Sequence, residues 1–332
     1  MPQRLESPLQ SAVSGQRILV VAEDPALRDK LAQAVRAGGG QPVTVAGVAE
    51  IPGPQVPYRL VIAGWDGRLD WLRAVCRRLR DSAQLVAMVP QRNLGEQVQI
   101  LADSHCNHVL TTDDRGMWLL QVTVNKFVTG ELFGIERYLP PGTPVMLTRL
   151  RDFQGRQNAI DEVLSFADKS GVRRQVRASI GQVCEELLMN ALYDAPVDAS
   201  GTPLFHHVDV KERVDKLSPR PVSIRYAVAE DSFAVSVRDR FGRLEKATIL
   251  RYIEKCLRSS DQIDRKTYGA GLGLYLIVNA ATQYVVNVDT DTAPPGAPAF
   301  NGEGYRPIYS SQTEIRQVST ESPQALRKPG KI

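Results

Sequence analysis

The sequence predicts two domains of different class: an α/β domain with a doubly wound parallel sheet, followed by an α+β domain. Three observations support this prediction. Short apolar strands alternate with amphipathic helices in the first half, a Pro-Pro-Gly break stands at 140–142, and the second half carries a long helix followed by a hairpin. The length of 332 residues also exceeds that of a typical single domain.

The first domain is predicted over 17–115, after a polar and aperiodic leader at 1–16. Its strands are expected at 18–21, 43–45, 60–63, 85–89 and 108–111, and its helices at 25–37, 71–79 and 95–103. The first helix is expected to stop at the three glycines that follow it, because glycine is costly inside helices and favourable at their ends.

A linker helix and turn are predicted at 116–142. The second domain is predicted at 143–320, and a disordered tail at 321–332. Within the second domain, strands are expected at 145–150, 222–228, 233–237, 284–288 and 314–318, and helices at 157–169, 176–192, 247–257 and 274–281. The helix at 176–192 has the strongest apolar periodicity in the chain.

Composition excludes several classes of protein. The net charge of +4 is spread along the chain, which does not indicate nucleic-acid binding. No apolar run approaches the roughly 18–20 residues of a membrane span, and residues 1–16 lack the apolar core of an export signal, so a cytoplasmic protein is expected.

The four cysteines, Cys76, Cys106, Cys184 and Cys256, are widely scattered, and no two have CxxC spacing. Together with the four histidines they leave a zinc site open. Reduced, buried thiols are the expectation for such cysteines in a cytoplasmic protein.

Glu186 and Asn190 stand four residues apart, at the edge of the apolar face of the helix 176–192. The Asn190 amide oxygen suits a hard cation such as Mg²⁺. Glu186 could orient water or accept a proton. Both side chains could equally be solvated residues at a helix edge.

Two further motifs follow along the chain. Asp239 and Gly242 come directly after a predicted strand, where a carboxylate can accept a hydrogen bond from an exocyclic amine, or where the four residues form an ordinary turn. Glycines 269, 271 and 273 lead into an apolar helix, an arrangement that lets backbone N–H groups approach an anion or that simply caps the helix. The glycines match neither a P-loop nor a dinucleotide fingerprint.

The order of these three motifs resembles the GHKL ATPase superfamily, which includes histidine kinases, anti-sigma-factor serine kinases, gyrase-type ATPases and Hsp90. The resemblance covers about 143–318 and implies an α+β sandwich of the Bergerat type that binds Mg-ATP. It implies the following roles: Asn190 as the Mg²⁺ ligand, Glu186 as the base, Asp239 and Gly242 at the adenine, Gly269, Gly271, Leu272 and Gly273 at the phosphates, and Thr313 near the base.

Two features of this half qualify the resemblance. The family's Asp-x-Gly-x-Gly is one residue longer here, as Asp-x-x-Gly-x-Leu. Segment 245–268 corresponds to the lid over ATP, and its basic residues could contact phosphates or form a solvated surface: Lys255, Arg258, Arg265 and Lys266.

The N-terminal half resembles a degenerate response-regulator receiver. Glu23 and Asp24 keep part of the acidic cluster expected after the first strand. Gly64 stands where the phosphoacceptor aspartate is expected, with Asp66 two residues late, and Thr112 replaces the expected lysine. The threonine or serine expected after the fourth strand is also replaced, by Val89 or Pro90. The resemblance therefore implies a pseudo-receiver used for protein contacts.

Two hypotheses of function follow. The first is a protein serine/threonine kinase of the anti-sigma type in a partner-switching pathway, since no histidine lies on a dimerising helix before the ATPase-like domain. The second is a non-catalytic, ATP-gated interaction switch. Both imply protein partners from a signalling pathway, with a homodimer as one option, and neither implies nucleic acid or membrane as a partner.

Overall fold

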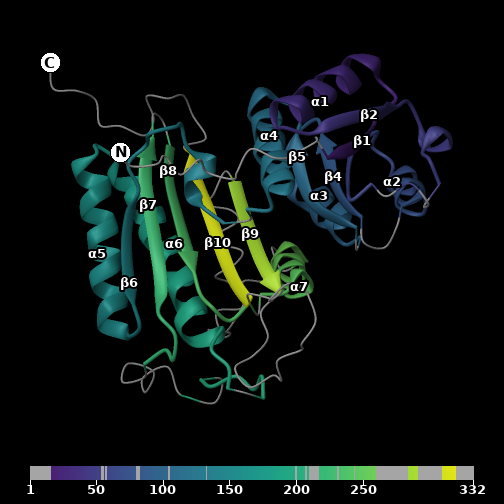
Figure 1. Ribbon diagram of the computed structural model, residues 1–332. Helices are drawn as coiled ribbons and strands as arrows, with labels where there is room; N and C mark the ends of the chain where they lie inside the picture. Colours follow the sequence, from purple (N-terminus) through teal and green to yellow (C-terminus); the bar gives the residue numbers. More distant parts are fainter. Residues whose placement is uncertain are drawn as a thin grey trace, which may run out of the picture. The chain divides into compact units, whose positions relative to one another are not determined.

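The computed structural model describes residues 16–53, 56, 58–79, 83–103, 105–131, 133–198, 200–205, 208, 217–229, 232–242, 244–258, 283–290 and 309–318 (Figure 1). The chain divides into two units, Met1–Leu132 and Phe133–Ile332. Each unit contains a five-stranded sheet.

The sheet of the first unit is entirely parallel. Its strands are β1 (Arg17–Val21), β2 (Gln41–Val45), β3 (Leu60–Gly64), β4 (Gln84–Val89) and β5 (Cys106–Thr111). They follow the order β2-β1-β3-β4-β5, the doubly wound order that is also found in flavodoxin and CheY. The predicted parallel α/β fold of the first half is confirmed.

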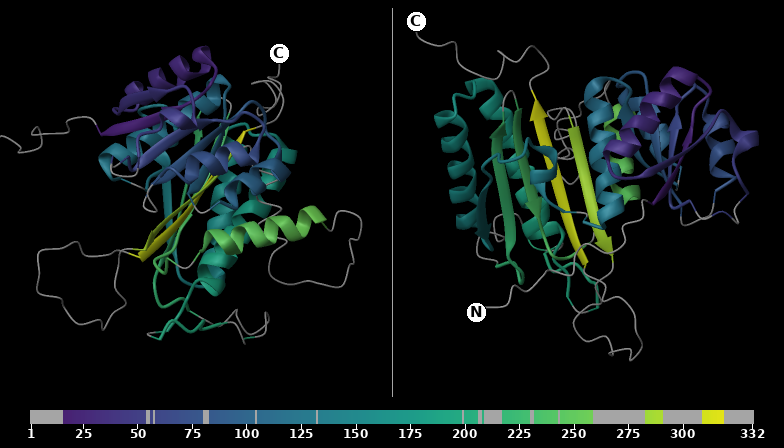
Figure 2. Two further views of the ribbon diagram at one scale, coloured as in Figure 1. Left: turned by 90° about the vertical axis from the view of Figure 1, so that its right-hand side faces the viewer. Right: turned by 45° about the horizontal axis from the view of Figure 1, so that its top comes forward.

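Helices cover both faces of this sheet (Figure 2). They are α1 (Pro25–Ala37), α2 (Leu69–Cys76), α3 (Leu94–Leu101) and α4 (Asp114–Thr129), with a short 3₁₀ turn, η1 (Val48–Glu50). Successive strand residues point to opposite faces, so Leu19 and Val21 enter the apolar cluster with α2 and α3, while Ile18 and Val20 enter the one with α1 and α4.

Helix α1 begins and ends where the sequence predicts. The carboxylate of Asp24 accepts hydrogen bonds from the backbone N–H groups of Ala26 and Leu27, and Pro25 is the first helical residue. Gly39, just past the helix, has a φ of 89°, in the left-handed region that favours glycine.

Helix α4 belongs to the first unit, although the sequence pattern predicts a linker over 116–142. Its Leu120 and Val124 are fully buried in the cluster that α1 also joins. The boundary between the units instead falls after Leu132. The Pro-Pro-Gly break therefore lies inside the second unit. It is part of the connection between η2 (Ile135–Tyr138) and the strand that follows.

The sheet of the second unit is antiparallel in every pairing. Its strands are β6 (Met146–Leu150), β7 (Val222–Ala229), β8 (Ser232–Arg238), β9 (Gln283–Thr290) and β10 (Tyr309–Val318), in the order β6-β7-β8-β10-β9. Its helices are α5 (Phe153–Lys169), α6 (Arg174–Met189) and α7 (Lys246–Arg258), and η3 (Asn190–Asp194) continues α6 as a turn of π-helix.

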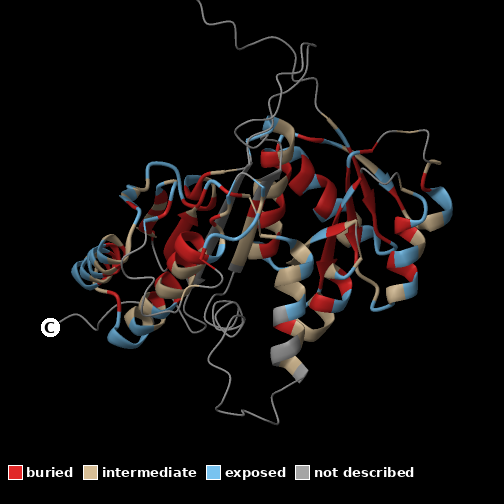
Figure 3. Cartoon of the chain, turned by 90° about the horizontal axis from the view of Figure 1, so that it is seen from below, coloured by how far each residue is buried: buried red, intermediate tan, exposed pale blue. Residues whose placement is uncertain are grey.

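One face of this sheet carries α5 and α6, and their apolar side chains share a core with Ile224, Phe233 and Val235 of the strands. The other face carries Ala227 and Ala234, which pack with η2. Figure 3 shows the buried residues gathered on the inward sides of the elements. An antiparallel sheet with helices on one face is an α+β arrangement, as predicted for this half; the Bergerat type remains a prediction.

Several expected segments lie outside the described residues: residues 1–15 of the leader predicted at 1–16, the helix at 274–281 and the tail at 321–332. Among the helices that are described, none has the length and apolar character needed to cross a membrane.

Candidate functional site

The C-terminal end of α6 lies at the end of the second sheet where β8 finishes. Strand β6 ends beside the start of β7, and β7 starts beside the end of β8. Helix α5 leaves from the end of β6, and a short turn at Gly171 sends α6 back in the opposite direction. The last residues of α6 and of β8 therefore come together at one end of this unit.

Helix α6 changes its hydrogen-bonding pattern at Asn190. The backbone carbonyl of Asn190 accepts from the N–H of Ala195, 2.8 Å away and five residues along the chain, so the helix widens into a π turn. Such turns often occur at functional sites. The wider turn exposes backbone groups that are paired in a regular α-helix. It starts at Asn190, the residue that the sequence predicts as a cation ligand.

Glu186 lies one turn before Asn190 and is partly buried. Burial raises the pKa of its carboxyl group, and the negative charges of Glu185 and Asp194 raise it further. Glu185 itself pairs with the guanidinium of Arg156, which is buried and stacks on the ring of Phe153. A carboxyl group with a raised pKa is a candidate for proton transfer.

Asp239 follows β8 and is buried, with 8% of its surface exposed. Its Oδ1 accepts from the backbone N–H groups of Phe241 at 2.7 Å and Gly242 at 3.4 Å. Gly242 has a φ of 65°, so the turn uses glycine where other residues are strained. The carboxylate is thus held in one orientation at the end of the sheet. These hydrogen bonds form the ordinary turn that was one of the two alternatives predicted for this motif.

Thr313 lies in β10 and pairs with Val237, two residues before Asp239. Its backbone is therefore close to the same sheet end as the C-termini of α6 and β8. Glu186, Asn190, Asp239 and Gly242 thus lie on elements that reach the same end of the sheet as this position. Gly269, Gly271, Leu272 and Gly273 lie outside the described residues, as do Arg265 and Lys266 of the expected lid.

The carboxyl end of the first sheet carries the remnants of the acidic cluster. Asp24 caps α1, as described above. The guanidinium of Arg68 lies 2.5 Å from the carboxylate of Asp66 and 3.8 Å from that of Glu23. A cationic side chain thus already pairs with two of the three acidic groups that would otherwise attract a metal ion.

The expected phosphoacceptor position cannot hold a larger side chain without rearrangement. A Cβ atom placed on Gly64 would lie 3.0 Å from the side chains of Ala22 and Leu27. The next residue, Trp65, donates from its indole nitrogen to Glu96 at 2.8 Å. Apolar packing and hydrogen bonds therefore occupy the place where a phosphorylation site is expected.

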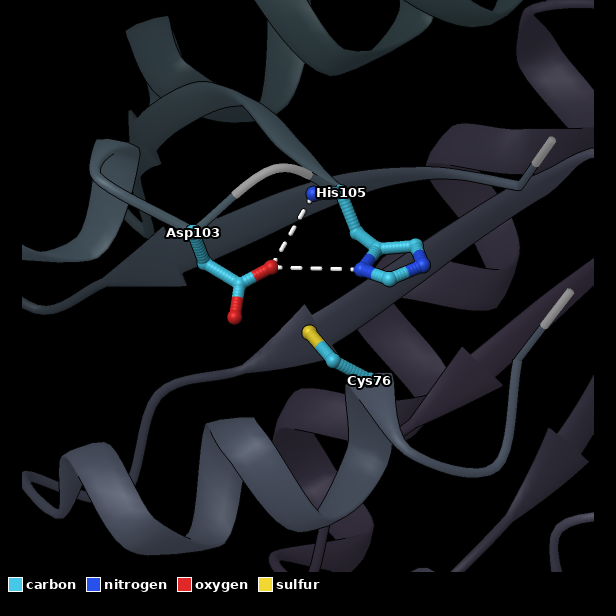
Figure 4. Close-up of side chains that lie close together, drawn as sticks. All are labelled: Cys76, Asp103 and His105. Atoms are coloured by element: carbon cyan, nitrogen blue, oxygen red, sulfur yellow. Dashed lines mark hydrogen bonds and ion pairs between the residues drawn. The ribbon is translucent and has the colours of Figure 1, made fainter. Parts of the chain in front are cut away.

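A third cluster, which the sequence did not single out, lies at the amino end of the first sheet. Cys76 ends α2, while Asp103 and His105 flank the turn between α3 and β5 (Figure 4). The Oδ1 atom of Asp103 accepts from the backbone N–H of His105 at 3.0 Å and lies 3.3 Å from its Nδ1. The sulfur, carboxylate and imidazole ligand atoms all lie within 4.8 Å of one another.

The groups of this cluster affect one another's protonation. Burial and the Asp103 charge raise the pKa of the Cys76 thiol to about 12. Burial also raises the pKa of Asp103, but hydrogen bonds from His105 and Cys76 outweigh that effect and hold it below its ordinary value. The expected burial is confirmed for Cys76, Cys106 and Cys184, which are free cysteines in this structure.

Comparison with known proteins gives similarities to solved structures only. The chain matches no protein-family model and no curated protein. Among solved structures it is similar to the BeF3-activated receiver domain of DrrB, at 14% identity and a TM-score of 0.29, over 35% of this chain and 98% of that one.

Two further similar structures cover the same share of the chain. A CheY-like receiver domain protein from Methanospirillum hungatei is 17% identical, with a TM-score of 0.29, over 35% of this chain and 96% of that one. A putative pilus assembly protein from Burkholderia thailandensis is 16% identical, with a TM-score of 0.30, over 35% and 99%. Each of these matches covers about a third of this chain and nearly the whole of the other chain.

Proposed function

We propose that the second unit binds an adenine nucleotide with Mg²⁺ at the sheet end where α6, β8 and β10 come together. The observation that carries this proposal is the convergence itself. Glu186, Asn190 and Asp239 are separated by up to 53 residues in the sequence, yet the antiparallel order of β6, β7 and β8 brings them to one end. The resemblance in motif order assigned them to one ATP site.

The residues at this end suit a magnesium ion. Mg²⁺ prefers oxygen ligands and takes few from the protein, while phosphates and water supply the others. The amide oxygen of Asn190 is a ligand of this kind, and the carboxylates of Glu185, Glu186 and Asp194 make the surroundings negative. The ion, when bound with nucleotide, neutralises phosphate charge. Asn190 is the residue that would hold it.

Asp239 is suited to select adenine. The turn fixes its carboxylate at the end of β8, where it can accept a hydrogen bond from the exocyclic amine of the base. A guanine base carries a carbonyl in the corresponding place, and two acceptors would then face each other. The site should therefore prefer ATP to GTP.

Glu186 is suited to act as a base toward a hydroxyl group or water. Its raised pKa leaves the carboxylate a better proton acceptor than an exposed glutamate. This favours a phosphotransfer enzyme, in the form of a kinase for serine or threonine of a protein partner. The receiver-like fold of the first unit is in keeping with a signalling protein.

The alternative is a switch that binds ATP without transferring phosphate. The first unit favours it, because Arg68 pairs with the acidic groups at its carboxyl edge and Gly64 replaces the acceptor. Such a unit would serve in protein contacts alone, and nucleotide binding in the second unit would control them.

Calorimetry of the full chain with ATP, with and without Mg²⁺, tests the proposal. We expect Asn190→Ala to weaken the Mg²⁺-dependent binding, and Glu186→Gln to bind nearly as wild type. With a partner protein, Glu186→Gln should lower phosphotransfer about 10²–10⁴-fold. Asp161→Asn, an exposed change on α5, is the matched control and should alter neither.

Two results would count against parts of the proposal. No ATP binding by the wild-type chain would refute the nucleotide site. ATP binding without phosphotransfer to any partner would favour the switch over the kinase.

A further inference from the structure

We propose that Cys76, Asp103 and His105 form a zinc-binding site at the amino end of the first sheet. The site is independent of the nucleotide site proposed above, since all three residues belong to the first unit. It also lies at the edge opposite the one where parallel α/β sheets usually bind ligands.

The fold, not the sequence, assembles the site. Helix α2 runs back from the carboxyl end of β3 and finishes at Cys76. Helix α3 likewise returns to the amino end, where the turn before β5 presents Asp103 and His105. The ligands thus come from two turns separated by 26 intervening residues, and an ion would link them.

The donor atoms suit zinc better than magnesium or calcium. A thiolate, an imidazole and a carboxylate are the three kinds of ligand that Zn²⁺ uses, whereas the harder cations prefer oxygen alone. Tetrahedral zinc with bonds of about 2.0–2.3 Å places its donors roughly 3.5 Å apart. The donors here lie within 4.8 Å, so side-chain movements of about 1 Å would close the site.

Charge and access also fit. Zinc requires the thiolate, so binding transfers the Cys76 proton to solvent, and the thiolate with the Asp103 carboxylate then balances the two charges of the ion. Cys76 is buried, but the side chains of Asp103 and His105 are 25% and 17% exposed. Solvent can therefore reach the site and supply a fourth ligand.

The alternative is a hydrogen-bonded polar cluster with no ion. It accounts for the contacts around Asp103, whose carboxylate lies 3.3 Å from Nδ1 of His105 (Figure 4). Nδ1 is the ring nitrogen that faces Asp103 and Cys76, so it is the atom that would bind zinc, in place of this contact. Metal binding by the wild-type chain therefore separates the two alternatives.

The test titrates the full chain, first freed of metal by a chelator, with Zn²⁺ and with Co²⁺ as a spectroscopic probe. We expect one ion per chain at this site, a thiolate-to-cobalt charge-transfer band in the near ultraviolet, and a higher melting temperature of the first unit with zinc. Cys76→Ser should abolish the band. Asp103→Asn and His105→Gln, which keep size and hydrogen-bonding ability, should each weaken binding at least about 100-fold, more than the loss of an outer partner costs.

Cys184→Ser, a buried cysteine of the second unit, is the matched control and should keep the band. Should Cys76→Ser fail to fold, the Asp103 and His105 variants decide. Two results would overturn the proposal: absence of the band in the wild-type chain, or zinc binding by all three variants that is as tight as that of wild type.

Discussion

Replacing Asp239 can separate its role in the turn from its proposed role toward the nucleotide. The Oδ1 atom accepts from two backbone N–H groups, and Asp239 and Phe241 are 8% and 7% exposed. Asn offers the same oxygen to the turn but presents an NH₂ group in place of the second oxygen. Ala offers neither.

The two variants should therefore differ in stability. A hydrogen bond to a charged group contributes about 1.5–3 kcal/mol, and removing it leaves a buried N–H unsatisfied. We expect Asp239→Ala to lose about 2–3 kcal/mol, which lowers the melting temperature of a unit of this size by roughly 5–10 °C. Asp239→Asn should stay within about 1 kcal/mol of wild type.

Nucleotide affinity should fall in the Asn variant even though its fold is intact. In the Asn variant, the NH₂ group of the side chain faces the exocyclic amine of adenine, so two donors meet and no hydrogen bond forms. Losing a charged hydrogen bond corresponds to roughly a 10- to 100-fold rise in Kd. Scanning calorimetry measures the stability, and isothermal titration with ATP measures the affinity. Wild-type affinity in Asp239→Asn would refute the contact with adenine, and wild-type stability in Asp239→Ala would refute the importance of the turn.

Two substitutions and one chemical treatment test the protonation of Glu186, the first unit as a phosphoacceptor and the cap of α1. Glu186→Gln should stabilise the second unit at pH 7, because the raised pKa means that the folded state disfavours the charged carboxylate. The gain should shrink as the pH falls from above the raised pKa to the ordinary value of 4.5 and should be absent below it; a gain that stays constant in thermal melts across this range would contradict this cause. Acetyl phosphate should leave the intact mass of the chain unchanged, since Arg68 pairs with Asp66 and Gly64 replaces the acceptor, and an adduct on Asp66 or Asp24 would show a working receiver. Asp24→Ala should cost the first unit about 1 kcal/mol in thermal denaturation through loss of the helix cap, with Asp29→Ala as the neutral control.

Local patterns predicted the first unit well because its elements carry their own signals. The Asp24 cap, Pro25 and the following glycines delimit α1, and the apolar run of β3 is buried throughout. Helix α4 was harder to assign. Its sequence shows a helix but not its partner, and only burial of Leu120 and Val124 against α1 places it in the first unit.

The candidate sites show where sequence reasoning stops. The spacing of Glu186 and Asn190 was visible, but the π turn was not, since Ala191, Leu192 and Tyr193 continue an apolar helical pattern. The order of β10 between β8 and β9 depends on pairing across distant segments. The cluster at Cys76 was missed for the same reason, although Asp-x-His at 103–105 is a signal that could have drawn attention to it.

Hydrogen exchange of the full chain, with and without Mg-ATP, tests the nucleotide site most directly, because it reports each segment separately. We expect nucleotide to slow exchange in three kinds of peptide together: those that contain the π turn at Asn190–Asp194, the Asp239 turn, and the backbone around Thr313 in β10. Peptides of the first unit, including those around Asp66, should exchange as before. Protection in the first unit alone, or in none of the three segments of the second unit at saturating Mg-ATP, would contradict the account.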